Sequence, residues 1–169
     1  FVNEGENTIE IIATDDLNDK SLPYGKQRIK RKGMWYTPVS GIWQTVWIES
    51  VPEKYISKIE TKTSENKVEI KLNYDANGTA IVKTSKNQEI LSCDFENGLI
   101  SFLIENPVYW SPENPYLYYV TIRTTDGDEV ETYFAFRTLE IKKINGISHL
   151  CLNGKPYFFH GLLDQGYWS

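Results

Sequence analysis

Short runs of alternating apolar and polar residues, separated by turn-forming dipeptides, constrain the fold of this 169-residue chain more than any other feature. The clearest run is residues 67–74, KVEIKLNY, in which every second residue is apolar. Successive side chains of a β-strand point to opposite faces, so this pattern predicts a strand with one face in the core. We therefore expect Leu72 to be buried and Lys71 to face solvent. The same alternation predicts that Val120 and Phe134 point inward.

Asn-Gly and Asp-Gly pairs divide this region into segments of similar length. Such dipeptides adopt positive φ easily and favour tight turns between antiparallel strands, which predicts hairpins at 77–78, 97–98 and 126–127. Together with residues 56–63, the runs amount to about seven short strands between residues 55 and 138, as in an immunoglobulin-like β-sandwich. No helical period of useful length competes, so the predicted fold class is all-β.

Trp110 lies in a proline-rich segment between two of the predicted strands. Proline has no backbone N–H for a sheet ladder, so this segment is expected to be a crossing loop. The ring of Trp110 is expected to cover the open end of the core, and a contact with a ligand is the alternative. The prolines of the segment are Pro107, Pro112 and Pro115.

Residues 1–52 form a separate block with two alternating runs, 7–16 and 41–51. Two strands cannot close a β-sandwich, so we interpret this block as the end of a domain that begins outside the chain. Between the runs, residues 18–40 are too long for a hairpin turn. Their basic cluster is interpreted as a solvated loop and not as a binding patch. It consists of Lys26, Arg28, Lys30, Arg31 and Lys32.

Charge and cysteine spacing argue against several kinds of partner. The net charge is −5, with 18 Lys and Arg against 23 Asp and Glu spread along the chain. No positive field is available for phosphates or an anionic membrane, so we expect neither nucleic acid nor a membrane as a partner. Cys93 and Cys151 match neither a zinc site nor a dense disulfide framework, and no cofactor or metal motif is present. The compartment and the oligomeric state are left open.

The last block, residues 148–161, contains two strand-like runs about Asn153 and Gly154. The second run, 156–161, is apolar enough to be buried on both faces, and polar residues follow it. A parallel barrel strand meets a site at its C-terminal end in this way. An edge hairpin explains the same residues equally well.

Three stretches, in the same order, resemble segments of glycoside hydrolase family 2, which contains β-galactosidases, β-glucuronidases and β-mannosidases. Residues 40–52, SGIWQTVWIESVP, are similar to the last strand of that family's sugar-binding jelly roll. Residues 106–122, NPVYWSPENPYLYYVTI, with 134–141, FAFRTLEI, resemble the end of its immunoglobulin-like domain. Residues 152–168, LNGKPYFFHGLLDQGYW, are similar to the linker and first strand of its catalytic barrel.

The resemblance implies the end of a jelly-roll domain at 1–52, an immunoglobulin-like β-sandwich at 53–140, and a linker with the start of a TIM barrel at 141–169. The chain is thus expected to be an internal fragment of an enzyme that hydrolyses terminal β-linked sugars, as a β-galactosidase does. Retaining glycosidases use two carboxyl groups about 5 to 5.5 Å apart. The resemblance places both glutamates beyond this chain, so no catalytic residue is expected within it. A non-enzymatic carbohydrate-binding or adhesion β-sandwich is the alternative.

The resemblance also implies candidate substrate-binding residues after the first barrel strand. In the intact enzyme, Asp164 and Gln165 are expected to hydrogen-bond sugar hydroxyls, and Trp168 to stack on a sugar face. A loop cap is the alternative for Asp164, and barrel packing is the alternative for Trp168. This chain departs from well-known β-galactosidases at His160 and the residues after it, and at Gly33, where those enzymes have Asp. The identity of the sugar therefore does not carry over.

Overall fold

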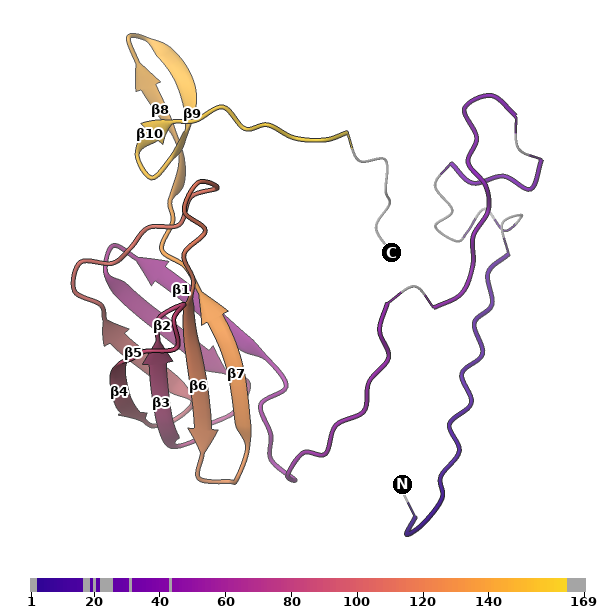
Figure 1. The fold of residues 1–169 in the computed structure, drawn as a ribbon, viewed down its shortest axis with the longest axis horizontal. Helices are drawn as coiled ribbons and strands as arrows, with labels where there is room; N and C mark the ends of the chain where they lie inside the picture. Colours follow the sequence, from indigo (N-terminus) through magenta and orange to yellow (C-terminus); the bar gives the residue numbers. More distant parts are fainter. Residues whose placement is uncertain are drawn as a thin grey trace. The chain divides into compact units, whose positions relative to one another are not determined.

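The computed structural model describes residues 3–16, 19, 21, 26–30, 32–42 and 44–163. The chain divides into two compact units, one comprising residues 1–48 and 160–169 and the other residues 49–159. All strands labelled in Figure 1 belong to the second unit. No helix among the described residues is long and apolar enough to cross a membrane.

Seven strands of the second unit form the two antiparallel sheets of a β-sandwich (Figure 1). The first sheet has the order β1-β2-β5, with β1 at Ile59–Ser64, β2 at Lys67–Leu72 and β5 at Leu99–Leu103. The second has the order β4-β3-β6-β7, with β3 at Gly78–Lys83, β4 at Glu89–Phe95, β6 at Tyr118–Thr124 and β7 at Glu129–Phe134. The predicted all-β sandwich of about seven strands is confirmed.

One apolar core lies between the two sheets. Val120 is fully buried, and Leu72 and Phe134 are each 4% exposed, whereas Lys71 is exposed. All four residues therefore face as the alternation predicts. The ring centroids of Phe102 on β5 and Phe134 on β7 are 5.9 Å apart, so aromatic packing joins the two sheets directly.

The predicted hairpin at 126–127 joins β6 and β7, which pair antiparallel. Gly127 has a φ of 93°, and its backbone N–H donates to the carbonyl oxygen of Thr124 at 3.1 Å. Residues 97–98 also form a tight turn, with φ values of 54° and 67°. Beyond a bridge between Glu96 and Leu99, however, β4 and β5 continue in different sheets, so this turn does not make a hairpin ladder.

The predicted hairpin at 77–78 is wrong. β2 pairs with β1 and β5, whereas β3 pairs with β4 and β6, so residues 73–77 cross from one sheet to the other. Gly78 is the first residue of β3 and does not have a positive φ. A Cβ atom there would lie 2.0 Å from the carbonyl oxygen of Arg123, so glycine is needed at this position for close strand packing.

A smaller sheet of order β10-β9-β8 follows, with β8 at Leu139–Ile144, β9 at Ile147–Leu152 and β10 at Lys155–Pro156. Both of its turns are Asn-Gly pairs with positive φ, at 145–146 and 153–154. Residues 155–156 pair antiparallel with β9. This pairing is the edge hairpin that the sequence analysis gave as the alternative for this block. Residues 157–163 form no strand here, and the role of residues 156–161 as the first barrel strand of the intact enzyme stays a prediction. A parallel strand requires flanking partner strands, and none pairs with these residues in the described structure.

No strand is formed among the described residues of 7–16 and 41–51, where two strands were expected. A bridge between Gln27 and Tyr36 closes a loop. Within this loop, the guanidinium carbon of Arg28 lies 4.4 Å from the ring centroid of Trp35. The basic segment is thus a loop, as expected, although Arg31 lies outside the described residues.

Candidate functional site

The predicted sugar-binding residues Asp164, Gln165 and Trp168 lie outside the described residues. The described part of that segment ends at Leu163, whose side chain is 87% exposed. The role assigned to these three residues therefore stays a prediction.

Several carboxylates of the sandwich unit are engaged in holding the fold together. The Asp128 carboxylate, which is buried, accepts a hydrogen bond from the backbone N–H of Ile56 at 2.7 Å. The Glu129 carboxylate pairs with Arg123 at 2.6 Å on the exposed face. Retaining hydrolysis instead needs two carboxyl groups that face one another across the scissile bond. The contacts of Asp128 and Glu129 are structural.

Glu113 and Tyr157 link the proline-rich loop to the segment after β10. The Tyr157 hydroxyl donates to the Glu113 carboxylate at 3.0 Å. Hydrogen bonds from its own backbone N–H, from Ser111 and from Tyr157 lower the pKa of Glu113 from its usual value. The same contact raises the pKa of Tyr157, because the neutral phenol is the donor. These hydrogen bonds tie the proline-rich loop to the segment after β10.

Trp110 was expected to cover the open end of the core, but it is not among the partly buried side chains that pack against the core cluster. It is half-buried, and the guanidinium carbon of Arg137 lies 5.2 Å from its ring centroid. Its backbone is fixed on both sides, since its N–H donates to the carbonyl of Phe136 at 2.8 Å and its carbonyl accepts from the Asn153 side chain at 2.9 Å. Tyr118, which is 3% exposed, is the nearby aromatic residue that belongs to the apolar core.

An open hollow of about 580 Å³ lies beside Trp110. It spans β1 and β7, which are edge strands of the two sheets. A hydrogen bond of 3.4 Å from the Thr63 hydroxyl to the carbonyl of Ala135 connects the two edges. The hollow is lined by Thr61, Thr63, Trp110, Leu117, Tyr133, Phe134, Ala135 and Arg137. Because Arg137 already covers one face of the Trp110 ring, that face is not available for stacking on a ligand.

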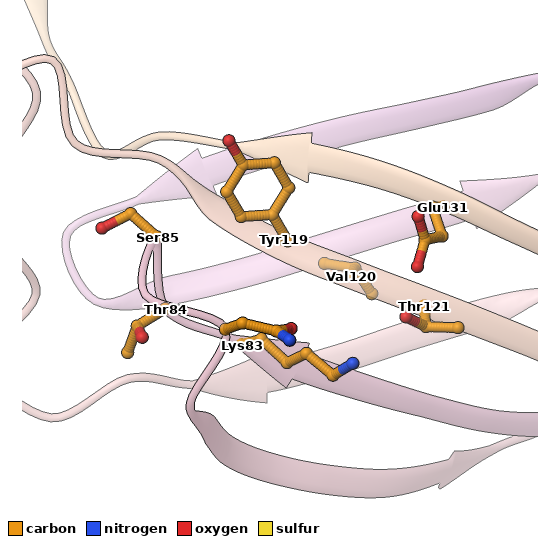
Figure 2. A pocket seen from close by; sticks show the side chains of 8 residues that line it. Lys83, Thr84, Ser85, Tyr119, Val120, Thr121 and Glu131 are labelled. Atoms are coloured by element: carbon orange, nitrogen blue, oxygen red, sulfur yellow. The ribbon is translucent and has the colours of Figure 1, made fainter.

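A second hollow, of about 260 Å³, lies on the outer face of the four-stranded sheet. Figure 2 shows Glu131 and Thr121 on one side and the turn residues Thr84 and Ser85 on the other, with Tyr119 and Lys83 between them. The hollow is lined by Lys83, Thr84, Ser85, Asn87, Tyr119, Val120, Thr121 and Glu131. We refer to it below as the outer-face pocket.

The outer-face pocket combines hydroxyl, amide, carboxylate and ammonium groups with an aromatic ring. Such a set suits reversible binding of a polar ligand. Among the described residues, no group of three or more His, Cys, Asp and Glu side chains is arranged to hold a metal ion. Sequence reasoning missed this pocket because its residues come from β3, β6, β7 and a turn, and their proximity depends on strand pairing.

Comparison with known proteins supports the fold and identifies the family. A beta-galactosidase of Halalkalibacterium halodurans is 28% identical over 153 residues, which covers 73% of this chain and 14% of that protein. Two solved structures share the fold. A beta-D-glucuronidase from Dictyoglomus thermophilum has a TM-score of 0.51 at 23% identity. The match covers 65% of this chain and 19% of the glucuronidase chain. A beta-glucuronidase of Faecalibacterium prausnitzii has a TM-score of 0.53 at 22% identity. The match covers 64% of this chain and 18% of the glucuronidase chain.

This chain thus spans less than one fifth of the length of each of these proteins. The family described as glycosyl hydrolases family 2 matches residues 46–137, which is more than half of the 169 residues. The match contains all seven strands of the sandwich. The chain belongs to glycosyl hydrolases family 2.

Proposed function

We propose that this chain is the central scaffold region of a larger family 2 glycosidase and does not catalyse the reaction alone. In this proposal residues 1–52 end a sugar-binding jelly roll, residues 53–140 form the sandwich, and residues 141–169 lead into a catalytic barrel. One observation carries the proposal: the family match at 46–137 coincides with the complete sandwich, while the chain amounts to 14% of the related beta-galactosidase.

We propose further that the whole enzyme hydrolyses terminal β-linked sugars with retention of configuration. The similarity to a beta-galactosidase supports this substrate class. A retaining mechanism needs a carboxylate to attack the anomeric carbon and a carboxylic acid to protonate the leaving oxygen. The structural contacts of Asp128 and Glu129 support the proposal that both catalytic glutamates come from elsewhere in the parent protein.

Hydrolysis assays of the parent enzyme and of residues 1–169 test whether this chain is a scaffold without catalytic activity of its own. The parent enzyme is expected to release the aryl group from an aryl β-galactoside or an aryl β-glucuronide, whereas purified residues 1–169 are expected to release none. Hydrolysis that copurifies with residues 1–169 and scales with their concentration would contradict the scaffold proposal. A parent protein that is folded but inactive on both substrates would contradict the enzyme proposal, and would favour a binding or adhesion module.

Asp164, Gln165 and Trp168 are proposed to contact the sugar in the parent enzyme. A hydrogen bond to a charged group is worth about 1.5 to 3 kcal/mol, so Asp164→Ala is expected to lower kcat/KM about 10-fold or more. The exposed Asp75 provides a matched control, since Asp75→Ala is expected to leave kcat/KM unchanged. If the Asp164→Ala enzyme kept the wild-type kcat/KM, the proposed sugar contact of Asp164 would be contradicted and Asp164 would be a turn residue.

A further inference from the structure

The outer-face pocket is built by cross-strand pairing on one face of the four-stranded sheet. Tyr119 on β6 pairs with Lys83 on β3 and with Tyr133 on β7. In the neighbouring row Thr121 pairs with Glu131. Because Val120 is fully buried in the core, Tyr119 and Thr121 on either side of it must point to the opposite, outer face. The face therefore carries a defined set of polar and aromatic side chains.

The turn that forms one wall of the pocket is held by its own hydrogen bonds. The backbone N–H of Thr84 donates to the carbonyl of Gln88 at 2.8 Å, and that of Asn87 donates to the carbonyl of Thr84 at 2.9 Å. The Thr84 hydroxyl oxygen accepts from the backbone N–H groups of Lys86 and Gln88, both at 3.3 Å. The wall is thus formed before any ligand arrives, so little ordering is needed on binding.

The charged groups of the pocket are available to a ligand. None of the described residues makes an ion pair or hydrogen bond with the Lys83 ammonium or the Glu131 carboxylate. By contrast, the neighbouring Arg123 and Glu129 on the same face neutralise each other at 2.6 Å. One free cation and one free anion give the pocket donors and acceptors without net charge. A neutral ligand rich in hydroxyl groups suits this balance better than an anionic one.

The aromatic ring and the size of the pocket specify the ligand further. Tyr119 is 45% exposed, so one part of its ring is free to lie against the apolar C–H face of a sugar. The volume of about 260 Å³ is just below the usual range for pockets of drug-sized ligands, so it suits one sugar ring and not a long chain. The turn residues Ser85 and Asn87 also line the pocket, where they can hydrogen-bond the hydroxyl groups of a bound sugar.

We propose that the outer-face pocket binds one neutral hexose unit of a glycan. The site is carried by the sandwich itself, so it does not depend on the catalytic activity proposed above. Its affinity is expected to be in the millimolar range, because a single sugar ring in an open pocket makes few contacts. Such a site would hold a glycan near the enzyme without reacting with it.

A titration of residues 1–169 labelled with ¹⁵N tests the proposal, with methyl β-galactoside, methyl β-glucoside and glucuronate as probes. The backbone amides of Asn87, Tyr119 and Thr121 are expected to show saturable shifts with at least one neutral sugar and weaker binding of glucuronate. No saturable shift at about 100 mM of either neutral sugar would overturn the proposal. Binding of glucuronate as tight as that of the neutral sugars would overturn the assignment of a neutral ligand.

Two exposed tyrosines on the same face provide a matched pair of variants. Tyr119 lines the outer-face pocket, whereas Tyr133 lines the hollow beside Trp110. Tyr119→Ala is expected to weaken sugar binding about 10-fold, Tyr119→Phe to retain most of it, and Tyr133→Ala to change it less than about 2-fold. Unfolding by urea checks that each variant is folded. Loss of binding in Tyr133→Ala but not in Tyr119→Ala would overturn the assignment to this pocket.

Discussion

The facing of individual strand residues follows directly from the alternation in the sequence. On β2 the buried Val68, Ile70 and Leu72 alternate with Glu69 and Lys71, neither of which is buried. The period of two residues makes this assignment strict, because a slip of one residue would exchange the core face and the solvent face. Burial could therefore be predicted for the sandwich without knowing which strands are neighbours.

Truncation of core residues on opposite sheets should be costly. Leu72→Ala and Phe134→Ala are each expected to lower the free energy of unfolding by about 2 to 5 kcal/mol, because each leaves a cavity in a close-packed interior. Lys71→Ala, next to Leu72 but exposed, is expected to cost less than about 0.5 kcal/mol. Urea unfolding measures all three, and similar losses at positions 71 and 72 would show that the register is wrong.

Tyr118 should make the stability of the sandwich sensitive to alkaline pH. Burial raises the pKa of its phenol, although the hydrogen bond that its oxygen accepts from Val108 N–H at 2.9 Å opposes this shift. The unfolded chain therefore ionises first, and the stability held below about pH 10 is lost as the pH rises towards the folded pKa. Urea unfolding is measured at intervals of about one pH unit between about pH 8 and about pH 11. The free energy of unfolding is expected to fall less at alkaline pH in Tyr118→Phe than in wild type. An equal loss in both proteins would assign the sensitivity to other groups.

At the scale of elements, Asn-Gly signals identify tight turns better than they identify hairpins. Residues 97–98 adopt the positive φ values expected of the dipeptide, yet the strands on either side enter different sheets. A sandwich needs such crossings to place both sheets on one core, and local sequence does not reveal which sheet a strand will join. The sequence region at 145–146 carries the same signal and does form a hairpin between β8 and β9. The outer-face pocket was missed for the same reason, since it depends on which strands pair.

The two turn glycines at 98 and 127 allow backbone strain to be separated from close packing. Both have positive φ, but a Cβ at Gly98 would lie 2.2 Å from the carbonyl oxygen of Tyr74, whereas one at Gly127 would meet no atom within 4 Å. Gly127→Ala is expected to cost about 1 to 2 kcal/mol from the left-handed conformation alone. Gly98→Ala should cost at least about 1 kcal/mol more, because the turn must move away from Tyr74. Equal losses in chemical unfolding would mean that the 97–98 turn moves without penalty.

At the scale of the whole molecule, the sheet of β8, β9 and β10 differs from the sandwich in what it leaves exposed. Ile141 pairs with Leu150, and these side chains are 74% and 47% exposed, while Leu139 on the same face is 58% exposed. In the sandwich, by contrast, Val120 and Ile122 on the inner face of β6 are fully buried. The proposed domain boundary at residue 140 lies just inside β8, which begins at Leu139, and residues 49–159 form one compact unit, so this boundary stays a prediction.

A matched pair of isoleucines tests whether that boundary separates two energetic units. Ile122→Thr places a hydroxyl in the core and leaves a small cavity, so it is expected to lower the free energy of unfolding of the sandwich by about 2 kcal/mol or more. Ile141→Thr makes the same chemical change on an exposed strand and is expected to cost less than about 0.5 kcal/mol. It should also weaken binding of a hydrophobic dye, because it interrupts an exposed apolar row. Hydrogen exchange of β6 and β9 amides in both variants gives the local readout. If Ile141→Thr destabilised β6 as much as Ile122→Thr does, the smaller sheet would unfold together with the sandwich, and the division at residue 140 would have to be abandoned.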